Sequence, residues 1–165
     1  MITPNTFAPR FKYQDRNIPI QEIVADHVAR NFGATSWRLD DRWCFDYCFT
    51  EKYPTGNKYE VKFYAEIKNR KGSDFDFSTY LLELPKALKA REYILATGFK
   101  VYICYGFGFI DNTIRRIMVH NLNPDLSYYQ KAWQKVTYRQ DKKYDNNVMI
   151  YIPKKSCTSI EIMGV

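Results

Sequence analysis

Two segments with alternating side chains, residues 43–49 and 59–68, flank a stretch of turn-forming residues and predict a β-hairpin. The first segment reads WCFDYCF and the second reads YEVKFYAEIK. Because side chains alternate between the two faces of a strand, each segment has one largely apolar face. The connection, residues 51–58 (EKYPTGNK), contains proline, glycine and asparagine, which favour a turn. We therefore expect the chain to be built around this hairpin.

The apolar faces of the two strands coincide when their pairing is centred near Gly56. Two carboxylates that lie directly across a strand ladder repel each other unless a cation lies between them. This register opposes Asp46 to Glu66, and the opposition indicates a metal site. The predicted pairs are Phe49 with Phe63, Tyr47 with Ala65, Phe45 with Ile67, Asp46 with Glu66, and Cys44 with Lys68.

Glu66 and Lys68 lie two residues apart on the second strand, so their side chains project from the same face. An acid and an amine in this arrangement occur on ordinary solvated sheet faces and also in the sites of metal-assisted phosphodiesterases. A second Glu-x-Lys triplet, residues 60–62, lies on the same strand face. Glu66 is the preferred candidate because it faces Asp46 in the predicted register and because an Asn-Arg pair follows its triplet.

Two helices are predicted from apolar residues at helical spacing and from the residues at their ends. Pro19 begins the first helix, which runs to about Phe32 and ends at Gly33. Pro85 begins the second helix, which ends at Gly98. The predicted buried stripes are Ile20, Ile23, Val24, His27 and Val28 on the first helix, and Leu84, Ala87, Leu88, Arg91, Ile94 and Leu95 on the second.

Each helix carries one further candidate site residue. Glu22 lies away from the apolar stripe, so it is either a surface acid or a sign that the first helix is rotated relative to this interpretation. Lys86 lies in the first turn of the second helix, where the helix dipole disfavours a cation. Lys86 is therefore either solvated or positioned, with the free N–H groups of that turn, to bind an anion.

The remaining segments predict more strands and an N-terminal arm. Residues 1–18 contain two prolines and no periodicity, so we expect an arm followed by a single domain over residues 19–165. Strands or extended segments are predicted at residues 37–39, 75–83, 100–105, 113–119 and 147–152, and a short helix at residues 124–139.

The composition favours a globular protein with a polyanionic partner. Of the 165 residues, 45% are hydrophobic, yet no apolar run approaches the ~20 residues of a membrane helix. The N-terminus lacks the apolar core of a signal peptide, so we expect a soluble protein of the cytoplasm. The four cysteines and two histidines show no zinc-finger spacing. The net charge of +7 favours nucleic acid as a partner, although a generic basic surface has the same charge.

Basic and aromatic residues are interleaved over residues 115–143, with Tyr128 and Trp133 among the rings. This mixture is typical of nucleic-acid grooves, in which cations contact phosphates and rings contact bases. A basic amphipathic helix whose rings pack inward has the same composition. The candidate nucleic-acid-binding residues, including two nearer the hairpin, are Arg70, Lys86, Arg115, Arg116, Lys131 and Lys135.

The order helix, strand, Asp-bearing strand, Glu-x-Lys strand, helix, strand over residues 20–105 resembles the PD-(D/E)xK nuclease superfamily. The layout is most similar to small phage members and to members like the Holliday-junction resolvases. Residues 86–98 (KALKAREYILATG) are similar to the Lys-bearing helix that follows the catalytic strand in that family. The resemblance implies an α/β, restriction-endonuclease-like fold: a mixed β-sheet core in the order α-β-β-β-α-β, flanked by helices and followed by additional C-terminal strands.

The resemblance also implies a Mg²⁺-dependent (or Mn²⁺-dependent) deoxyribonuclease that acts in recombination or DNA processing. Asp46, Glu66 and the Ile67 carbonyl would hold the metal, and Lys68 would orient the attacking water or stabilise the transition state. DNA is the implied partner, and relatives of the resolvase kind are often dimers. One departure from the family pattern is Phe45, which stands where the family has proline.

Two other functions remain compatible with the residues alone. One is a nucleic-acid-binding module that has the same fold and charge but no catalytic activity. The other is a structural or interaction protein in which the Glu66 and Lys68 face is only solvated.

Overall fold

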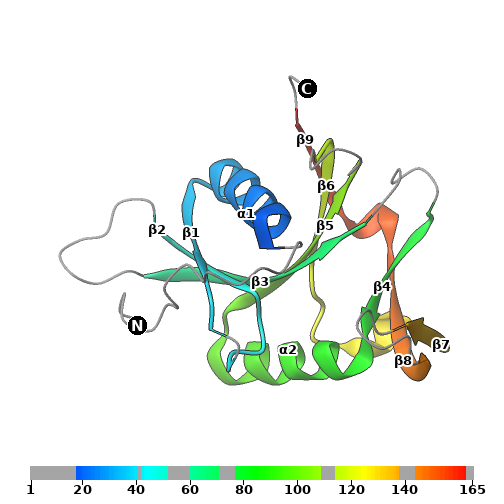
Figure 1. Cartoon of the computed structure of the whole chain (residues 1–165). Coiled ribbons are helices and arrows are strands. Elements are labelled where there is room, and N and C mark those ends of the chain that lie inside the picture. The colour runs from blue at the N-terminus through cyan, green and yellow to red at the C-terminus, as the bar shows by residue number, and fades with distance from the viewer. Residues whose placement is uncertain are drawn as a thin grey trace.

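The computed structural model describes residues 18–40, 42–51, 60–70, 77–108, 114–137 and 144–162, with the main chain alone at residues 18–19, 134–137 and 144–147. Figure 1 shows how the helices and strands are arranged. In chain order they are α1 (Ile18–Phe32), β1 (Ala34–Arg38), β2 (Tyr47–Glu51), β3 (Val61–Asn69), β4 (Thr79–Glu83), α2 (Leu84–Thr97), β5 (Lys100–Phe107), β6 (Arg116–Asn121), the 3₁₀ turn η3 (Leu126–Tyr128), β7 (Gln130–Thr137), β8 (Tyr144–Pro153), the 3₁₀ turn η4 (Lys154–Ser156) and β9 (Thr158–Glu161).

A six-stranded mixed sheet in the order β1-β2-β3-β5-β6-β9 forms the centre of the molecule. β3 and β5 are parallel neighbours, and the other described neighbours in this sheet are antiparallel. Parallel neighbours need a long crossover connection, and here the connection consists of β4 and α2. The six elements α1, β1, β2, β3, α2 and β5 therefore follow the predicted α-β-β-β-α-β order, with β4 inserted before α2.

α1 covers one face of the central sheet (Figure 1). Its buried stripe includes Ile20, Val24 and Val28, as predicted, and it packs on Phe49 and Phe63 of the hairpin. The helix ends at Gly33, whose φ of 59° is accessible to glycine at little cost.

α1 approaches β5 closely at Gly106. A Cβ atom built on Gly106 would lie 2.8 Å from Val24 Cγ2 and 2.9 Å from Ile114 Cδ1. Both distances are shorter than ordinary van der Waals contact, so the lack of a side chain at this position allows the helix to lie against the strand.

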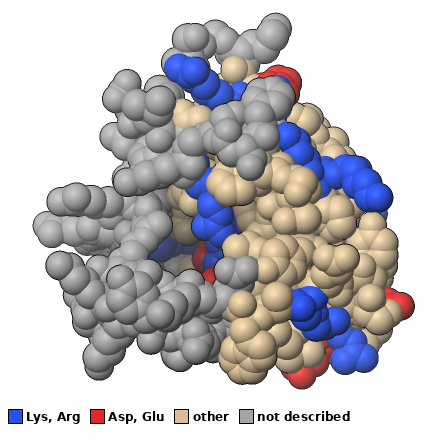
Figure 2. Space-filling view, turned by 90° about the vertical axis from the view of Figure 1, so that its right-hand side faces the viewer, with Lys and Arg blue, Asp and Glu red and all other residues tan. Residues whose placement is uncertain are grey.

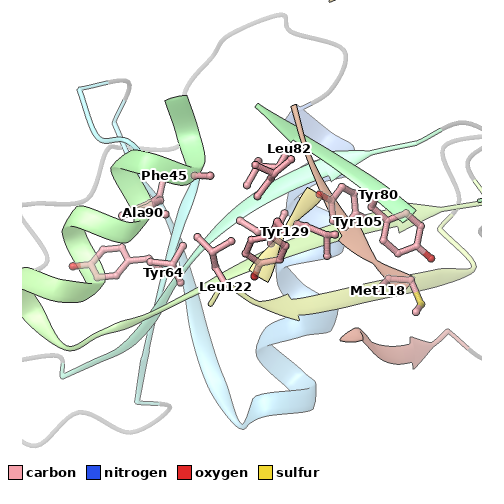
Figure 3. Packing of buried hydrophobic residues seen from close by; sticks show 14 of the residues in the cluster. Phe45, Tyr64, Tyr80, Leu82, Ala90, Tyr105, Met118, Leu122 and Tyr129 are labelled. Atoms are coloured by element: carbon pink, nitrogen blue, oxygen red, sulfur yellow. The ribbon is translucent and has the colours of Figure 1, made fainter. Parts of the chain in front are cut away.

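α2 covers the opposite face, over a core that is rich in aromatic residues (Figure 3). Phe45, Tyr64 and Tyr93 pack with ring centroids 5.0–5.4 Å apart. Figure 3 also shows Tyr80, Leu82 and Tyr105 beside one another in this core. α2 ends at Gly98, which has a φ of 75° and whose N–H donates to the Ile94 carbonyl, as the sequence predicted.

A second sheet of three antiparallel strands, in the order β4-β8-β7, lies beside the central one. The Tyr105 hydroxyl of β5 donates to the Leu81 carbonyl of β4 at 3.0 Å and so joins the two sheets. β4 continues into α2 without a connecting loop. This sheet was not expected as a separate layer, because only residues 75–83 and 147–152 were predicted to be extended.

The predicted hairpin register is confirmed where the two strands pair. Tyr47 lies opposite Ala65, and Phe49 lies opposite Phe63. The prediction fails before residue 47, because residues 42–46 form bends instead of continuing β2. Phe45 is therefore not opposite Ile67, and its ring packs on the α2 face. The two other predicted pairs, Asp46 with Glu66 and Cys44 with Lys68, do not form in the ladder either.

The predicted helix over residues 124–139 is wrong. The chain forms the short turn η3 and then β7, because the residues after 130 alternate in a strand rather than in a helix. The predicted buried stripe of α2 is also wrong in part. Leu88 and Leu95 are 41% and 65% exposed, whereas the predicted Ala87 is buried together with Ala90, which was not predicted. Small side chains allow the helix to lie close to the bulky rings of the sheet.

The α/β class, with a mixed central sheet and the predicted α-β-β-β-α-β order, is confirmed by the strand pairing. The five further predicted strands overlap β1, β4, β5, β6 and β8, with shifted ends, whereas β7 and β9 were not expected as strands. Most of the predicted N-terminal arm, residues 1–18, and the predicted turn at residues 52–58 lie outside the described residues, so they stay predictions. Among the described helices, none has the length and apolar character needed to cross a membrane.

Candidate active site

Asp46 lies where β2 begins, against the edge of β3. Its main-chain N–H donates to the Ala65 carbonyl at 3.2 Å, and its carbonyl accepts the Leu39 N–H at 2.9 Å. Its side chain then extends along β3, where Oδ2 accepts the Ile67 N–H at 2.8 Å. The carboxylate therefore occupies the position in which a further residue of β2 would pair with β3.

The Ile67 carbonyl faces the same edge of β3. In an antiparallel ladder, the N–H and C=O of one residue point to the same neighbouring strand. Because the Ile67 N–H points to Asp46, its carbonyl oxygen also points to the Asp46 side. Asp46 and the Ile67 carbonyl, both predicted metal ligands, thus lie at one edge.

Glu66 is buried beneath α2, with 3% of its surface exposed, and the two oxygens of its carboxylate differ in their partners. Oε1 is ion-paired with Lys68 at 3.0 Å and also with Lys86. Oε2 is buried and accepts no hydrogen bond within the described part of the chain. A buried carboxylate oxygen without a partner is costly. Glu66 can therefore accept a further cation or donor through Oε2.

Lys68 lies between two acids. Its ammonium is 3.0 Å from Glu66 Oε1 and 3.3 Å from Glu83 Oε2. Glu83 is the last residue of β4 and directly precedes α2, so this ion pair joins β3 to the start of α2. Burial alone would raise the pKa of Glu83, but the positive charge of Lys68 lowers it below the ordinary value.

Lys86 extends from the first turn of α2 to Glu66. Lys86 is thus paired with a side chain of the same protein, and its predicted binding of an anion from outside stays a prediction. Burial would lower the pKa of Lys86, but the neighbouring Glu66 carboxylate raises it above the ordinary value. The ammonium is therefore firmly held in the charged form.

A cavity of about 220 Å³ opens beside these residues. Arg38 of β1 forms part of its wall, and its Nη1 is buried without a hydrogen-bond partner among the described residues. Arg38 pairs with Tyr47 across the β1–β2 ladder, so it lies opposite the residue that directly follows Asp46. The complete lining is Gln21, Arg38, Leu39, Asp40, Trp43, Cys44, Phe45, Asp46, Glu66 and Lys86.

The electrostatics of the site are dominated by two close acids. Burial and the negative charge of Glu66 raise the pKa of Asp46 from 3.8 to about 6. The hydrogen bond from Ile67 and the charges of Lys86 and Lys68 act in the opposite direction but are outweighed. The ionised form of Asp46 is thus disfavoured until more positive charge arrives.

The donor set fits a divalent cation that prefers oxygen ligands. Asp46, Glu66 Oε2 and the Ile67 carbonyl are all oxygen donors, and Mg²⁺ is typically held by one or two carboxylates with water or substrate oxygens. Within the described residues, no group of three or more His, Cys, Asp or Glu side chains forms a self-sufficient metal centre. The described residues therefore fit a metal ion whose remaining ligands are water and substrate oxygens.

The rival triplet at residues 60–62 lies on the surface. Glu60 and Lys62 are both exposed, whereas Glu66 is buried and Lys68 is half-buried. The alternative of a solvated Glu/Lys face, which the residues alone left open, therefore applies to residues 60–62 and not to residues 66–68.

Several other predicted site residues lie apart from the cavity. α1 contributes Gln21 to its wall, whereas Glu22 is not among the lining residues, and its role stays a prediction. Arg70 donates its N–H to the Gly106 carbonyl and holds its guanidinium 5.9 Å from the centre of the Tyr105 ring.

The remaining basic candidates lie on β6 and β7 or, in the case of Arg115, directly before β6. Arg115 is exposed, and Arg116 is ion-paired with Glu161 of β9. The ammonium of Lys131 donates to the Leu126 carbonyl at 2.8 Å. Lys135 lies on β7, where only the main chain is described. None of these four belongs to the cavity lining.

Glu83 and Arg38 were not predicted as site residues. Glu83 has a weak signal in the sequence, because an acid directly before a helix that begins Leu-Pro-Lys is placed at the helix N-terminus. Arg38 has no such signal, because its position depends on the pairing of β1 with β2. That pairing becomes visible only in the folded chain.

Comparison with solved structures shows a weak structural similarity. The fold is similar to that of Hjc, a Holliday junction resolvase from the archaeal hyperthermophile Archaeoglobus fulgidus, with a TM-score of 0.44. The two share 12% sequence identity, over 86% of this chain and 91% of that chain. No protein-family model matches the sequence. No curated protein sequence matches it either.

Proposed function

We propose that this protein is a divalent-metal-dependent deoxyribonuclease of the PD-(D/E)xK type. The observation that carries the proposal is Glu66 Oε2, a buried carboxylate oxygen without a partner among the described residues, beside the disfavoured charge of Asp46. A binding face or a structural surface has no need to bury one carboxylate beside a second, half-buried one in this way. A cation between them would remove the cost.

Each residue of the site has a role that follows from its position. Asp46, Glu66 and the Ile67 carbonyl would hold Mg²⁺ or Mn²⁺. A bound divalent ion lowers the pKa of a coordinated water and neutralises charge on a scissile phosphate. Lys68, held between Glu66 and Glu83, would keep an ammonium beside the reacting oxygens and stabilise their developing charge.

Arg38 and Lys86 would bind the phosphate that enters the cavity. Arg38 contributes a buried guanidinium nitrogen without a partner within the described residues, and guanidinium groups bind phosphate through paired N–H donors. Lys86 lines the same cavity at the positive end of α2. The basic net charge of +7 favours a polyanion as substrate, and DNA is the polyanion proposed.

The test is cleavage of plasmid, single-stranded and branched DNA with Mg²⁺ or Mn²⁺, and without metal in EDTA. We expect metal-dependent cleavage by the wild type and a loss of at least about 100-fold in Glu66→Gln, since a catalytic metal ligand contributes several kcal/mol. Glu60→Gln is the matched control, because Glu60 starts the exposed triplet of the same strand region, and it should cleave as the wild type does. Equal activity in wild type and Glu66→Gln would refute the proposal.

A non-catalytic DNA-binding module is the second candidate, and one observation favours it. Both Lys68 and Lys86 contact Glu66 Oε1, so part of the acidic charge is already compensated by the protein itself. Salt-sensitive DNA binding without cleavage under any divalent metal would support this candidate and not the nuclease.

A further inference from the structure

Two ammonium groups share one oxygen of the buried Glu66 carboxylate, and they are held differently. Lys68 is 3.0 Å from Glu66 Oε1 and has a second acid, Glu83, at 3.3 Å. Lys86 also pairs with Oε1, but no second acid forms a salt bridge with it within the described residues. Two like charges at the same oxygen repel each other. The pair with Lys86 is therefore the one that depends on Glu66 alone.

The two lysines also differ in their freedom to move. The side chain of Lys86 is 43% exposed, whereas that of Lys68 is 16% exposed. A lysine carries its ammonium on a flexible stem of four carbons, so an exposed one can change partner without movement of the main chain. Lys86 is therefore the cation that can leave Glu66, while Glu83 keeps Lys68 in place.

A second anion can reach Lys86 in the cavity beside Glu66. Lys86 lines this cavity together with Asp46, Glu66 and Arg38. Figure 2 looks at the side of the molecule on which α2 begins in Figure 1, and it shows basic side chains beside acidic ones at a recess of the surface. A cation in the first turn of a helix is disfavoured by the helix dipole unless an anion accompanies it. When Lys86 leaves Glu66, a phosphate in the cavity can be that anion.

The other oxygen of Glu66 supplies the reason for Lys86 to leave. Glu66 Oε2 is buried without a hydrogen-bond partner among the described residues, on the carboxylate whose Oε1 already meets two ammonium groups. A divalent ion held by Oε2 and Asp46 would be the third cation at this carboxylate. Repulsion among the three is relieved when the least restrained of them, Lys86, moves away.

We propose that Lys86 exchanges partners during the reaction cycle. In the metal-free protein it compensates the charge of Glu66, and once a divalent ion is bound it turns to a phosphate of the substrate. This inference rests on the proposed function for the metal and for the phosphate. Metal binding and DNA binding are then coupled through one side chain, and each raises the affinity for the other by the same factor.

The first measurement is Mn²⁺ binding without DNA, by isothermal titration calorimetry. Lys86→Met should bind Mn²⁺ about 10-fold more tightly than the wild type, because no ammonium has to leave Glu66 first. Lys86→Arg should bind it several-fold more weakly, because a guanidinium can hold a carboxylate through two parallel N–H donors. Glu66→Gln should lose the binding and so shows that the titrated site is the one described.

Lys89→Met is the matched control. Lys89 is exposed and lies about one turn further along α2, outside the lining of the cavity. Its replacement removes the same charge from the same helix without touching Glu66. The Mn²⁺ affinity of Lys89→Met should stay within about 2-fold of the wild type, as expected for an exposed charge screened by water and salt.

The second measurement is the coupling between metal and DNA. Fluorescence anisotropy gives the affinity for a labelled duplex in EDTA and in Ca²⁺, a cation that also takes oxygen ligands, with the DNA checked to be intact afterwards. Wild type and Lys89→Met should bind the duplex about 10-fold more tightly with Ca²⁺, and this factor should fall at least about 3-fold in Lys86→Met. A lysine that binds phosphate without leaving Glu66 would change both affinities equally and leave the factor as it is.

Equal Mn²⁺ affinities of Lys86→Met and Lys89→Met, or an unchanged coupling factor in Lys86→Met, would overturn the inference. The outcomes also separate it from the proposed nuclease function. If the wild type cleaves DNA with Mg²⁺ and Glu66→Gln does not, but Lys86→Met shows neither effect, only the exchange is refuted. If Lys86→Met shows both effects and no metal supports cleavage by the wild type, the exchange is confirmed and the nuclease function is refuted.

Discussion

The carboxylate of Asp46 accepts the main-chain N–H of Ile67 at 2.8 Å, so a side chain completes the ladder where β2 has not yet begun. This contact brings an acid to the edge of the strand that carries Glu66. It also leaves the Ile67 carbonyl on the same side. The site therefore depends on a strand that begins late, and not on two acids facing each other across a regular hairpin.

Asp46→Asn should stabilise the metal-free protein at neutral pH. The pKa of Asp46 is raised from 3.8 to about 6, so the folded state binds this proton more tightly than the unfolded state. The contribution of Asp46 therefore lowers the free energy of unfolding as the pH rises from about 4 to about 6. Asparagine can still accept the Ile67 N–H but has no charge. We expect a gain on the order of 2 kcal/mol at pH 8 and none at pH 4, measured by urea denaturation in EDTA.

Asp46→Ala separates the charge from the hydrogen bond. Alanine removes the acceptor of the Ile67 N–H as well, at a cost of about 1 kcal/mol, so this variant should be less stable than Asp46→Asn at both pH values. A stabilisation by Asp46→Asn that is the same at pH 4 and pH 8 would contradict the assignment of the effect to charge.

Lys68→Met should destabilise the protein by about 2–3 kcal/mol, because it leaves Glu66 and Glu83 without the cation between them. Glu83→Gln in the Lys68→Met background should recover part of this loss, and a double-mutant cycle from denaturation curves gives the coupling. Lys62→Met, at an exposed position of the same strand, is the control and should be close to neutral. Additive effects at positions 68 and 83 would show that the ion pair contributes nothing.

His120 should make the protein less stable in mild acid. It is buried at 3% exposure, with Nε2 at the Tyr129 hydroxyl and Nδ1 3.1 Å from Ser156 Oγ. Burial lowers the pKa of His120 below 6.5, so the folded state binds fewer protons than the unfolded state. This contribution to stability is present above pH 6.5 and is lost as the pH falls below it.

Denaturation at pH 7.5 and 5.5 tests this effect. His120→Gln should lose about 1–2 kcal/mol at pH 7.5, through its hydrogen bonds, and should depend less on pH than the wild type. His27→Gln is the comparison, since the pKa of His27 is also lowered by burial but its side chain is only half-buried. If both variants lose the same pH dependence, His120 is not its main source.

Gly106→Ala should lower stability by about 1–3 kcal/mol, because the added methyl group meets Val24 and Ile114 at less than 3.0 Å. Thermal denaturation measures the change. In a Val24→Ala background the same substitution should cost less, since the nearest contact is then removed. An equal cost in both backgrounds would place the strain elsewhere than between α1 and β5.

The sequence predicts those parts of the fold in which local pattern and tertiary packing agree. The pairing of Tyr47 with Ala65 follows from the alternation of apolar residues, and Gly33 and Gly98 end their helices as expected. The same reasoning fails at Phe45 and Trp133. Phe45 fits the alternating pattern of the first strand, but β2 begins only at residue 47. Trp133 lies in a segment that the sequence predicts as a helix, although its residues form the strand β7.

The site is predictable only to the extent that it lies on one strand. Glu66 and Lys68 are neighbours in the chain, so their spacing reveals them. Arg38 is brought to the site by the pairing of β1 with β2, and Glu83 by the packing of β4 beside the central sheet, so local spacing reveals neither residue. A buried oxygen without a partner, such as Glu66 Oε2, is a property of that packing alone.

β4 passes into α2 at Glu83 and Leu84 with no residues between them to absorb movement. The small sheet and the N-terminus of α2 are therefore expected to move together. Because Glu83 is ion-paired with Lys68, a tilt of β7 and β8 would be transmitted along β4 to the ammonium beside Glu66. A displacement of β7 and β8 would thus reach Glu83 through a continuous main chain, and it would change the position of the Lys68 ammonium relative to Glu66.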